Sequence, residues 1–403
     1  GVMGADRRFR MLTFPNKFQP IDRRWGGSVR RSDLVASVFM FALLSVPVLA
    51  AETLPVTPDA ARYRLDTSWP QLPLPNKWAM GGVGGIFVDA NDHVWVHAAT
   101  RDIPNYARGA EQNPPAGDCC VAAPPVIEFD ADGKVVQGWG GAGTGYQWPS
   151  YAHGLYVDHK GNVWVGGSQT REGQDGSPPD GQILKFTRDG KFLLQIGSAG
   201  PSKGSLDRTQ LSGPSNMVVD PQANEVYVSD GYGNHRVVVF DADTGKFKRH
   251  WGAYGKSPTD NDIGRYDPGA PPAQQFRIVH CVRIAKDGLV YVCDRLNNRI
   301  QVFRKDGTFV TEYIYRKETR GSGAVGTIEF WPDAKQSLMI MNDPGNFRVH
   351  FVRRADGQVL SSFGHYGTYG GELDRNHEAV VDSKGNIFVS EDRRVQKFKY
   401  VPN

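Results

Sequence analysis

The chain has 403 residues, with 47 Lys and Arg against 43 Asp and Glu, for a formal net charge of +4. The basic residues seldom form runs, so the sequence lacks the basic stripe typical of nucleic-acid binding proteins, and we expect no nucleic-acid partner. The length alone would fit two or three domains, but internal repeats outweigh length as a guide to architecture.

An apolar run near the start is typical of an export signal. Arg30 and Arg31 precede the apolar residues 34–49, and Val48-x-Ala50 follows the small-residue pattern of a cleavage site. We therefore expect residues 1–51 to be an upstream extension and signal peptide, and the protein to be secreted or periplasmic. A retained membrane anchor is the alternative, although the run is short for a spanning helix. An uncleaved signal segment would be the expected route of membrane contact.

Residues 52–403 are predicted to form one domain, because one pattern recurs six times in them. Each unit has a strand ending in Asp or its equivalent, a second strand of the form Val-Tyr/Trp-Val, a third ending near Phe-Asp and a fourth often ending in Trp-Gly or Phe-Gly. Unit five is degenerate. The second strands are the easiest to recognise, at residues 94–96, 163–165, 226–230, 290–294, 338–341 and 387–390.

Four antiparallel strands repeated around an axis predict an all-β fold, a six-bladed β-propeller. Short strands could also form a sandwich, but repetition of the whole unit argues against it. The sixth unit lacks a fourth strand, and residues 62–69 have the length and the terminal Trp of one. We expect this N-terminal segment to close the last blade, because closure removes an open sheet edge.

Three histidines occupy the same place in alternate units. His153, His280 and His377 each stand five residues before the end of the first strand, in units two, four and six. Smaller residues stand there in the other units: Gly84, Ser215 and either Val325 or Gly326. Alternate blades of six lie about 120° apart, so three imidazoles at one height would converge on the axis. Three His ligands with an open position are typical of a catalytic zinc site.

The loops after the second strands open on the same mouth of the channel. They carry Arg101, Arg171, Tyr232, Arg295, Asp343 and Glu391. Arg can bind a carboxylate through two parallel hydrogen bonds, so a small or peptidic substrate with a carboxylate is expected. A Tyr beside a cation and an Arg is expected to have a lowered pKa and to act as a base.

Several strings resemble one known family. They are His153-Gly-Leu, residues 226–236, residues 294–301 and His377-Glu378, within six NHL-type repeats covering residues 62–400. This pattern is similar to peptidyl-α-hydroxyglycine α-amidating lyase, which cleaves the C–N bond of a C-terminal α-hydroxyglycine and releases a peptide amide and glyoxylate. The resemblance implies that His153, His280 and His377 hold zinc.

The resemblance also implies roles for other residues. Tyr232 would be the base or the orienting hydroxyl for the substrate hydroxyl, and Arg101 and Arg295 would bind the carboxylate and developing charge. A structural calcium would be held by the backbone carbonyls of Val83 and Leu155 and by the carboxylate of Glu378.

The chain departs from the family pattern at several of these places. Glu378 stands where the family has Asp, Arg375 where it has Met, and Gly233 where it has a Cys. Arg101 is placed only with an insertion, and His97 lies nearby as a competitor. These departures leave the zinc ligands in place and affect the pocket around them.

The four cysteines form two pairs in the sequence. Cys281 and Cys293 flank a tight turn and should lie directly opposite each other, where a cross-strand disulfide is possible in an exported protein. Cys119 and Cys120 are adjacent in a Pro-rich loop, where a vicinal disulfide, an intermolecular bond or two free thiols are all possible.

Three functions remain open on the sequence. The first is a secreted zinc-dependent carbon–nitrogen lyase of the amidating type. The second is a non-catalytic NHL propeller that acts as a binding module. The third is a metal-dependent propeller hydrolase such as a lactonase, against which the all-His ligand set argues.

Overall fold

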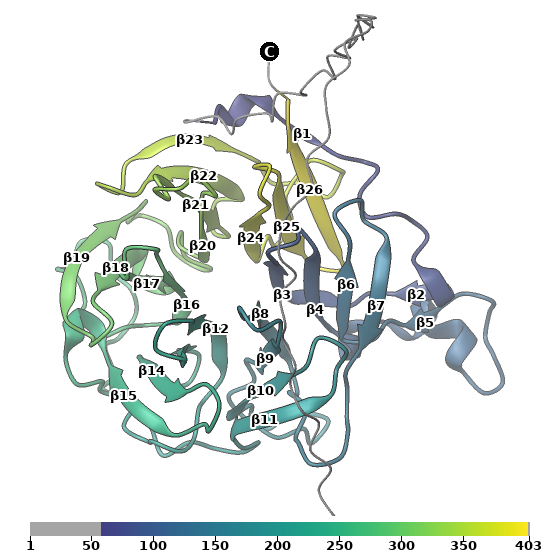
Figure 1. Cartoon of the computed structure of the whole chain (residues 1–403), viewed down its shortest axis with the longest axis horizontal. Coiled ribbons are helices and arrows are strands. Elements are labelled where there is room, and N and C mark those ends of the chain that lie inside the picture. Colours follow the sequence, from purple (N-terminus) through teal and green to yellow (C-terminus); the bar gives the residue numbers. More distant parts are fainter. Residues whose placement is uncertain (1–57, 402–403) are drawn as a thin grey trace, which may run out of the picture. The chain divides into compact units, whose positions relative to one another are not determined.

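The computed structural model describes residues 58–401, so the predicted leader, residues 1–51, lies outside the described residues. Within residues 58–401, six four-stranded antiparallel sheets surround a central channel (Figure 1), which confirms the predicted all-β, six-bladed propeller. β-Branched and aromatic residues between Gly-, Asp- and Asn-containing turns favour strands in these segments. In this part of the chain, no helix has the length and apolar character needed to cross a membrane.

The blades follow one another along the chain, and in each the first strand lines the channel. Blade one contains β3 (Gly82–Val88), β4 (Val94–Ala99), β6 (Val126–Phe129) and β7 (Val135–Trp139), and blade two contains β8 (Ala152–Val157), β9 (Val163–Gly167), β10 (Gln182–Phe186) and β11 (Phe192–Gly197). Blade three contains β12 (Pro214–Asp220), β13 (Glu225–Asp230), β14 (Arg236–Asp241) and β15 (Phe247–Trp251).

The second half of the ring repeats this order. Blade four contains β16 (Val279–Ile284), β17 (Val290–Asp294), β18 (Arg299–Phe303) and β19 (Phe309–Ile314), and blade five contains β20 (Thr327–Phe330), β21 (Leu338–Asp343), β22 (Arg348–Arg353) and β23 (Val359–Phe363). Blade six contains β24 (Glu378–Val381), β25 (Ile387–Glu391), β26 (Arg394–Tyr400) and β1 (Tyr63–Leu65).

Short elements lie in the connections. The parallel pair β2 (Trp78–Ala79) and β5 (Val121–Ala122) was not expected from the sequence. The 3₁₀ turns are η1 (Ala60–Arg62), η2 (Pro75–Lys77), η3 (Thr100–Asp102), η4 (Asn105–Glu111), η5 (Ala253–Gly255) and η6 (Arg295–Asn297).

The hydrophobic core is divided among the interfaces between blades. Each apolar cluster of the described residues joins one blade to the next, including one that joins blade six to blade one. The first strands contact one another in sequence, and β24 contacts β3 to complete the ring. Since each blade buries its faces only against its neighbours, the ring must close to be stable.

An N-terminal strand closes the ring, as predicted. β1 pairs antiparallel with β26, with Tyr63 opposite Tyr400 and Leu65 opposite Phe398. Trp69, which follows the strand, is 4% exposed, and its ring centroid lies 4.9 Å from that of Phe388. Burial of a side chain this large is worth on the order of 4–6 kcal/mol of apolar transfer free energy.

Both cysteine pairs are disulfide-bonded in the structure. Cys281 of β16 lies opposite Cys293 of β17, as predicted, with their Cα atoms 4.9 Å apart. Cys119 and Cys120 form a vicinal disulfide in the long connection between β4 and β6.

Candidate metal centre

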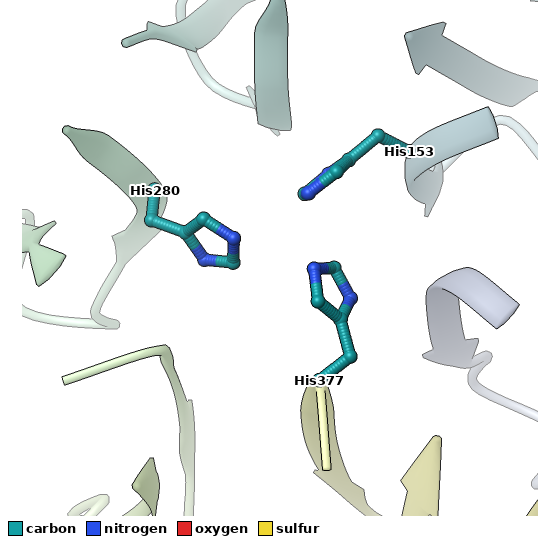
Figure 2. A group of neighbouring side chains, drawn as sticks. All are labelled: His153, His280 and His377. Atoms are coloured by element: carbon teal, nitrogen blue, oxygen red, sulfur yellow. The ribbon is translucent and has the colours of Figure 1, made fainter. Parts of the chain in front are cut away.

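Three imidazoles from alternate blades point toward one another in the channel (Figure 2). His153 lies in β8, His280 in β16, and His377 directly before β24. One ring nitrogen of each lies within 4.8 Å of the others, and the ring centroids are 4.5–5.1 Å apart. His153 and His280 are buried, whereas His377 is partly exposed.

For each imidazole, the neighbouring blade places backbone beside Nδ1, the ring nitrogen that does not face the other two histidines. Nδ1 of His153 lies 2.6 Å from the carbonyl oxygen of Ser215, and Nδ1 of His280 lies 2.8 Å from that of Gly326. His377 has the backbone of Gly84 as its partner, although its Nδ1 makes no hydrogen bond of standard geometry. A proton held on Nδ1 leaves the Nε2 lone pair free. This is the tautomer in which a His can bind a metal through Nε2.

The three acceptors stand at the same repeat position as the histidines, in blades three, five and one. Small residues are required there because the backbones approach closely. A Cβ on Gly84 would lie 2.0 Å from the carbonyl oxygen of Ala152. Gly154, next to His153, has φ +55°, and a Cβ there would lie 2.6 Å from the Ser215 carbonyl oxygen. The alternation of large and small residues therefore positions the imidazoles.

The donor set fits a metal ion. Burial is the main cause that lowers the pKa of all three rings, to about 3 for His377 and well below the usual value for His153 and His280, so the rings are neutral near pH 7. The Tyr232 hydroxyl lies 3.0 Å from Nε2 of His153 and 3.1 Å from Nε2 of His280. One hydroxyl proton cannot satisfy several converging lone pairs, and a cation such as Zn²⁺ can.

Arg295 adds positive charge beside Tyr232. Its Nη1 donates a hydrogen bond of 3.2 Å to the Tyr232 hydroxyl, and its guanidinium lies 5.6 Å from the centre of the Tyr232 ring. Burial raises the Tyr232 pKa, and Arg295 only partly opposes that effect. The lowering expected from the sequence required a metal cation as well as Arg295, so it stays a prediction; without the metal, loss of solvation outweighs the charge of Arg295.

Two buried ion pairs hold the loops that carry these residues. Nε of Arg236 donates to Asp230 at 2.9 Å, across the loop containing Tyr232. Nε of Arg299 donates to Asp294 at 2.9 Å, across the loop containing Arg295. Each pair joins the end of a blade's second strand to the start of its third, so the loop between them has a fixed base.

A cleft of about 340 Å³ opens above the histidines, a volume typical of small-ligand sites. Its lining includes His153, His377, Tyr232 and Arg295. Apart from Val83, Gly84 and Arg375, the sequence did not single out its other lining residues, most of which come from loops without a repeat signature. Tyr151, Ser168, Ser322, Pro344, Asn376 and Asp392 belong to this group.

Arg101 is not among the residues that line the cleft. Its Nη1 donates to Oε1 of Gln169 at 2.9 Å, and its guanidinium lies 4.5 Å from the ring centre of Tyr151, which lines the cleft. In the structure Arg101 lies beside the cleft and not in its lining, so its contact with substrate stays a prediction. The physical reason is that the long connection after β4 folds into η3 and η4, and Arg101 lies in η3.

His97 is a structural residue in this arrangement. It is fully buried, and burial lowers its pKa to about 4. Its Nδ1 lies 3.3 Å from the carbonyl oxygens of both His153 and Gly154, so it supports the backbone of a metal ligand from behind. It lies outside the group of three converging histidines.

The carboxylate implied for calcium already has other partners. Both carboxylate oxygens of Glu378 accept hydrogen bonds, one from the Ile86 backbone N–H and one from the Asn216 side chain. Val83 and Leu155 are buried residues of β3 and β8. A protein cation, Arg283, is buried near the same carboxylate. This set does not fit calcium, which prefers six to eight oxygen ligands and no competing cation.

Comparisons with known proteins agree with the repeat pattern. A family model for the NHL repeat matches residues 211–240 and 276–303, in blades three and four. Among solved structures, a streptogramin B lyase structure aligns with a TM-score of 0.50 at 14% identity, covering 85% of this chain and 99% of that chain. At this identity the likeness shows the fold alone.

Two kinds of curated relatives match most of the chain. Peptidyl-glycine alpha-amidating monooxygenase A of Xenopus laevis is 25% identical over 354 residues, 84% of this chain and 33% of that protein. NHL repeat-containing protein 3 of Mus musculus is 27% identical over 364 residues, 84% of each chain. The chain thus spans about a third of the length of the amidating monooxygenases that it matches. It is an NHL-repeat propeller with sequence similarity to amidating monooxygenases and to NHL repeat-containing proteins.

Proposed function

We propose that this protein is an exported, zinc-dependent lyase that cleaves a C–N bond at an α-hydroxylated carbon bearing a carboxylate. The observation that carries the proposal is the convergence of three neutral imidazoles, the Tyr232 hydroxyl and the Arg295 guanidinium in one cleft. The similarity to the amidating monooxygenases supports the choice of this chemistry.

The chain's own residues would act on the proton and on the carboxylate. Zinc held by Nε2 of His153, His280 and His377 would act as a Lewis acid on a substrate oxygen. The Tyr232 hydroxyl, which is protonated in these surroundings, would relay a proton by taking up that of the substrate hydroxyl as it releases its own. As the C=O bond forms and the C–N bond breaks, the released proton would pass to the leaving nitrogen, giving an amide and glyoxylate. Arg295 would orient Tyr232 and bind the substrate carboxylate.

The surroundings of the site support a small or peptidic, anionic substrate. The cleft volume suits one terminal residue of a peptide or an acylated glycine. Arg295 lines the cleft and supplies positive charge, whereas Arg375 is paired with Asp392 of the same lining at 3.0 Å. Two disulfides within the described residues favour an oxidising compartment, in keeping with secretion or a periplasmic location.

The test combines metal analysis with a direct assay of product. Purified protein is analysed for bound metal and then given an N-acyl-α-hydroxyglycine, and glyoxylate release is measured. One zinc per chain with zinc-dependent glyoxylate release is expected. Zinc without glyoxylate would retain the metal centre and refute the substrate. A protein without stoichiometric zinc and without activity would refute both.

A binding propeller is the second candidate. It is favoured by the match to NHL repeat-containing protein 3, which covers 84% of each chain. The two candidates differ in the assay above, because a binding module would retain ligand without turnover.

A further inference from the structure

A second polar layer lies directly beneath the histidines in the channel. Glu378 and Asn216 each stand one position after the histidine position of their blades, and both are fully buried. Nδ2 of Asn216 donates to Oε1 of Glu378 at 2.9 Å. The carboxylate that the family resemblance assigns to calcium is therefore joined to a side chain from blade three.

Arg283 extends this layer with a buried cation. It stands three positions after His280 on β16 and is 3% exposed. Its Nη1 donates to Oδ1 of Asn216 at 2.9 Å, and its Nε donates to Oε2 of Glu329 at 3.0 Å. Four side chains from four blades thus form one chain of contacts, Glu378–Asn216–Arg283–Glu329.

The arrangement of donors in this layer disfavours a metal. Nη2 of Arg283 is buried and has no hydrogen-bond partner, so the surrounding space requires an additional acceptor. A divalent cation would meet that unpaired N–H group and the charge of the guanidinium at low dielectric, where like charges repel strongly. An uncompensated buried carboxylate would otherwise be costly, and the charge of Arg283 opposes that of Glu378 through space, while its direct ion pair is with Glu329.

We propose that the Arg283 guanidinium is the built-in counter-cation of Glu378, in the role that the family resemblance assigns to calcium, and that this propeller binds no calcium in its channel. The inference does not depend on the lyase reaction, because it concerns a layer below the candidate metal centre. It predicts that the fold is independent of calcium.

Calcium binding to the full, zinc-loaded chain tests this inference. Extracellular calcium modules bind with dissociation constants of about 10⁻⁴–10⁻³ M, so calorimetric titration to about 5 mM calcium covers the relevant range. The wild-type protein is expected to show no binding and no calcium-dependent change in its thermal midpoint. Stoichiometric binding of one calcium with a raised thermal midpoint would overturn the proposal.

Variants of Arg283 test the cause. R283M keeps an extended side chain without charge, and it is expected to gain a site for one calcium and a thermal midpoint that rises with calcium concentration. R283K retains the cation and is expected to gain none. The gained site should disappear in R283M/E378Q, which distinguishes Glu378 from Glu329 as the ligand. A folded R283M chain that still binds no calcium would refute the role of Arg283.

Loss of the fold in R283M would also be informative. The variant would then be refolded with and without about 5 mM calcium, above the dissociation constants given for such modules. Recovery of the fold only with calcium supports the proposal, and failure in both buffers overturns it. Because these readouts measure calcium and folding, a negative glyoxylate assay leaves their outcome unaffected.

Discussion

Two groups of potential metal ligands in residues 58–401 look alike by distance but differ in charge balance. His153, His280 and His377 form one group, and Asp89, His93 and Glu128 form the other, with ligand atoms within 4.8 Å in both. In the second group, Nη2 of Arg188 lies 2.9 Å from Oδ2 of Asp89 and also contacts Glu128.

The acidic group is therefore already compensated by a protein cation. His93 Nδ1 lies 2.6 Å from Oε1 of Glu128, and the Trp95 indole donates to Asp89 at 3.1 Å. Burial alone would raise the Asp89 pKa, but hydrogen bonds from Trp95, nearby backbone groups and Arg188 together hold it below its usual value. Proximity of ligand atoms is thus insufficient evidence for a metal site. Converging acceptors that no protein cation contacts directly are the stronger signal, since Arg295 reaches the histidine group only through the Tyr232 hydroxyl.

Substitution of one histidine in each group should show most clearly which of the two groups binds zinc. H280A is expected to lose stoichiometric zinc and activity, because a directly bound ligand matters more than outer partners, whose loss costs about 10–100-fold in affinity. H93A is the matched control and should retain one zinc per chain. Metal analysis and zinc titration of both variants provide the measurement. Equal zinc loss in the two variants would contradict the assignment of zinc to the histidine group rather than to the acidic group.

A substitution at Tyr232 should distinguish metal binding from catalysis at the histidine group. Y232F removes the hydroxyl that would move the substrate proton, so kcat is expected to fall by about 10²–10⁴-fold with zinc content retained. Y151F, another tyrosine of the cleft, should change kcat only a few-fold. Unchanged kcat in Y232F would remove Tyr232 from the reaction and leave the zinc site in place.

The ring and the histidine group could be predicted from sequence because both depend on register. A strand ending in Asp fixes the height of each first strand, so His153, His280 and His377 could be aligned without any structure. The same alignment identified Gly84 and Ser215 as small residues. It did not reveal that their backbone carbonyls, together with that of Gly326, would lie against the imidazoles.

Features that join different blades without a repeat signature were missed. Asn216, Arg283 and Glu329 meet only because neighbouring first strands twist around one channel, and their identities vary from blade to blade. Asn342 supports the His377 carbonyl oxygen from blade five at 2.9 Å, but that unit is degenerate in sequence. The sequence predicted that Arg101 lines the cleft, whereas in the structure it lies beside the lining. The periodicity of strands carries no information about the path of the long connection after β4.

His97 offers a test of burial without metal binding, since it lies behind the first group. Its folded pKa is about 4 and its unfolded value is 6.5, so the unfolded chain takes up the proton first as the pH falls. The stability of the wild type relative to H97Q should be constant above pH 6.5, fall between pH 6.5 and about 4, and level off below. The full change is about 3 kcal/mol.

Urea unfolding of wild type and H97Q across this pH range measures the effect. The contributions of the three converging histidines appear in both proteins and cancel in the difference. Parallel curves for the two proteins would mean that His97 is solvated or protonated in the fold, contrary to its buried position.

Removal of Arg188 sharpens the comparison at the acidic group. R188M leaves Asp89 and Glu128 without their cation, and breaking a fully buried pair costs about 3–5 kcal/mol. The Arg188 side chain is 36% exposed, so solvent screening should reduce the loss to about 1–3 kcal/mol. The double variant R188M/E128Q should regain most of this stability, because one of the unpaired charges is then gone.

R188M also tests whether charge balance alone explains why the histidine group would bind a metal and the acidic group would not. If Arg188 is what excludes a metal, R188M should bind zinc at a second site, and metal analysis should give more than one zinc per chain. The R188M/E128Q chain should return to one. A stable R188M chain that binds a single zinc would contradict this explanation. It would mean that the geometry of Asp89, His93 and Glu128, and not the charge of Arg188, keeps a metal from the acidic group.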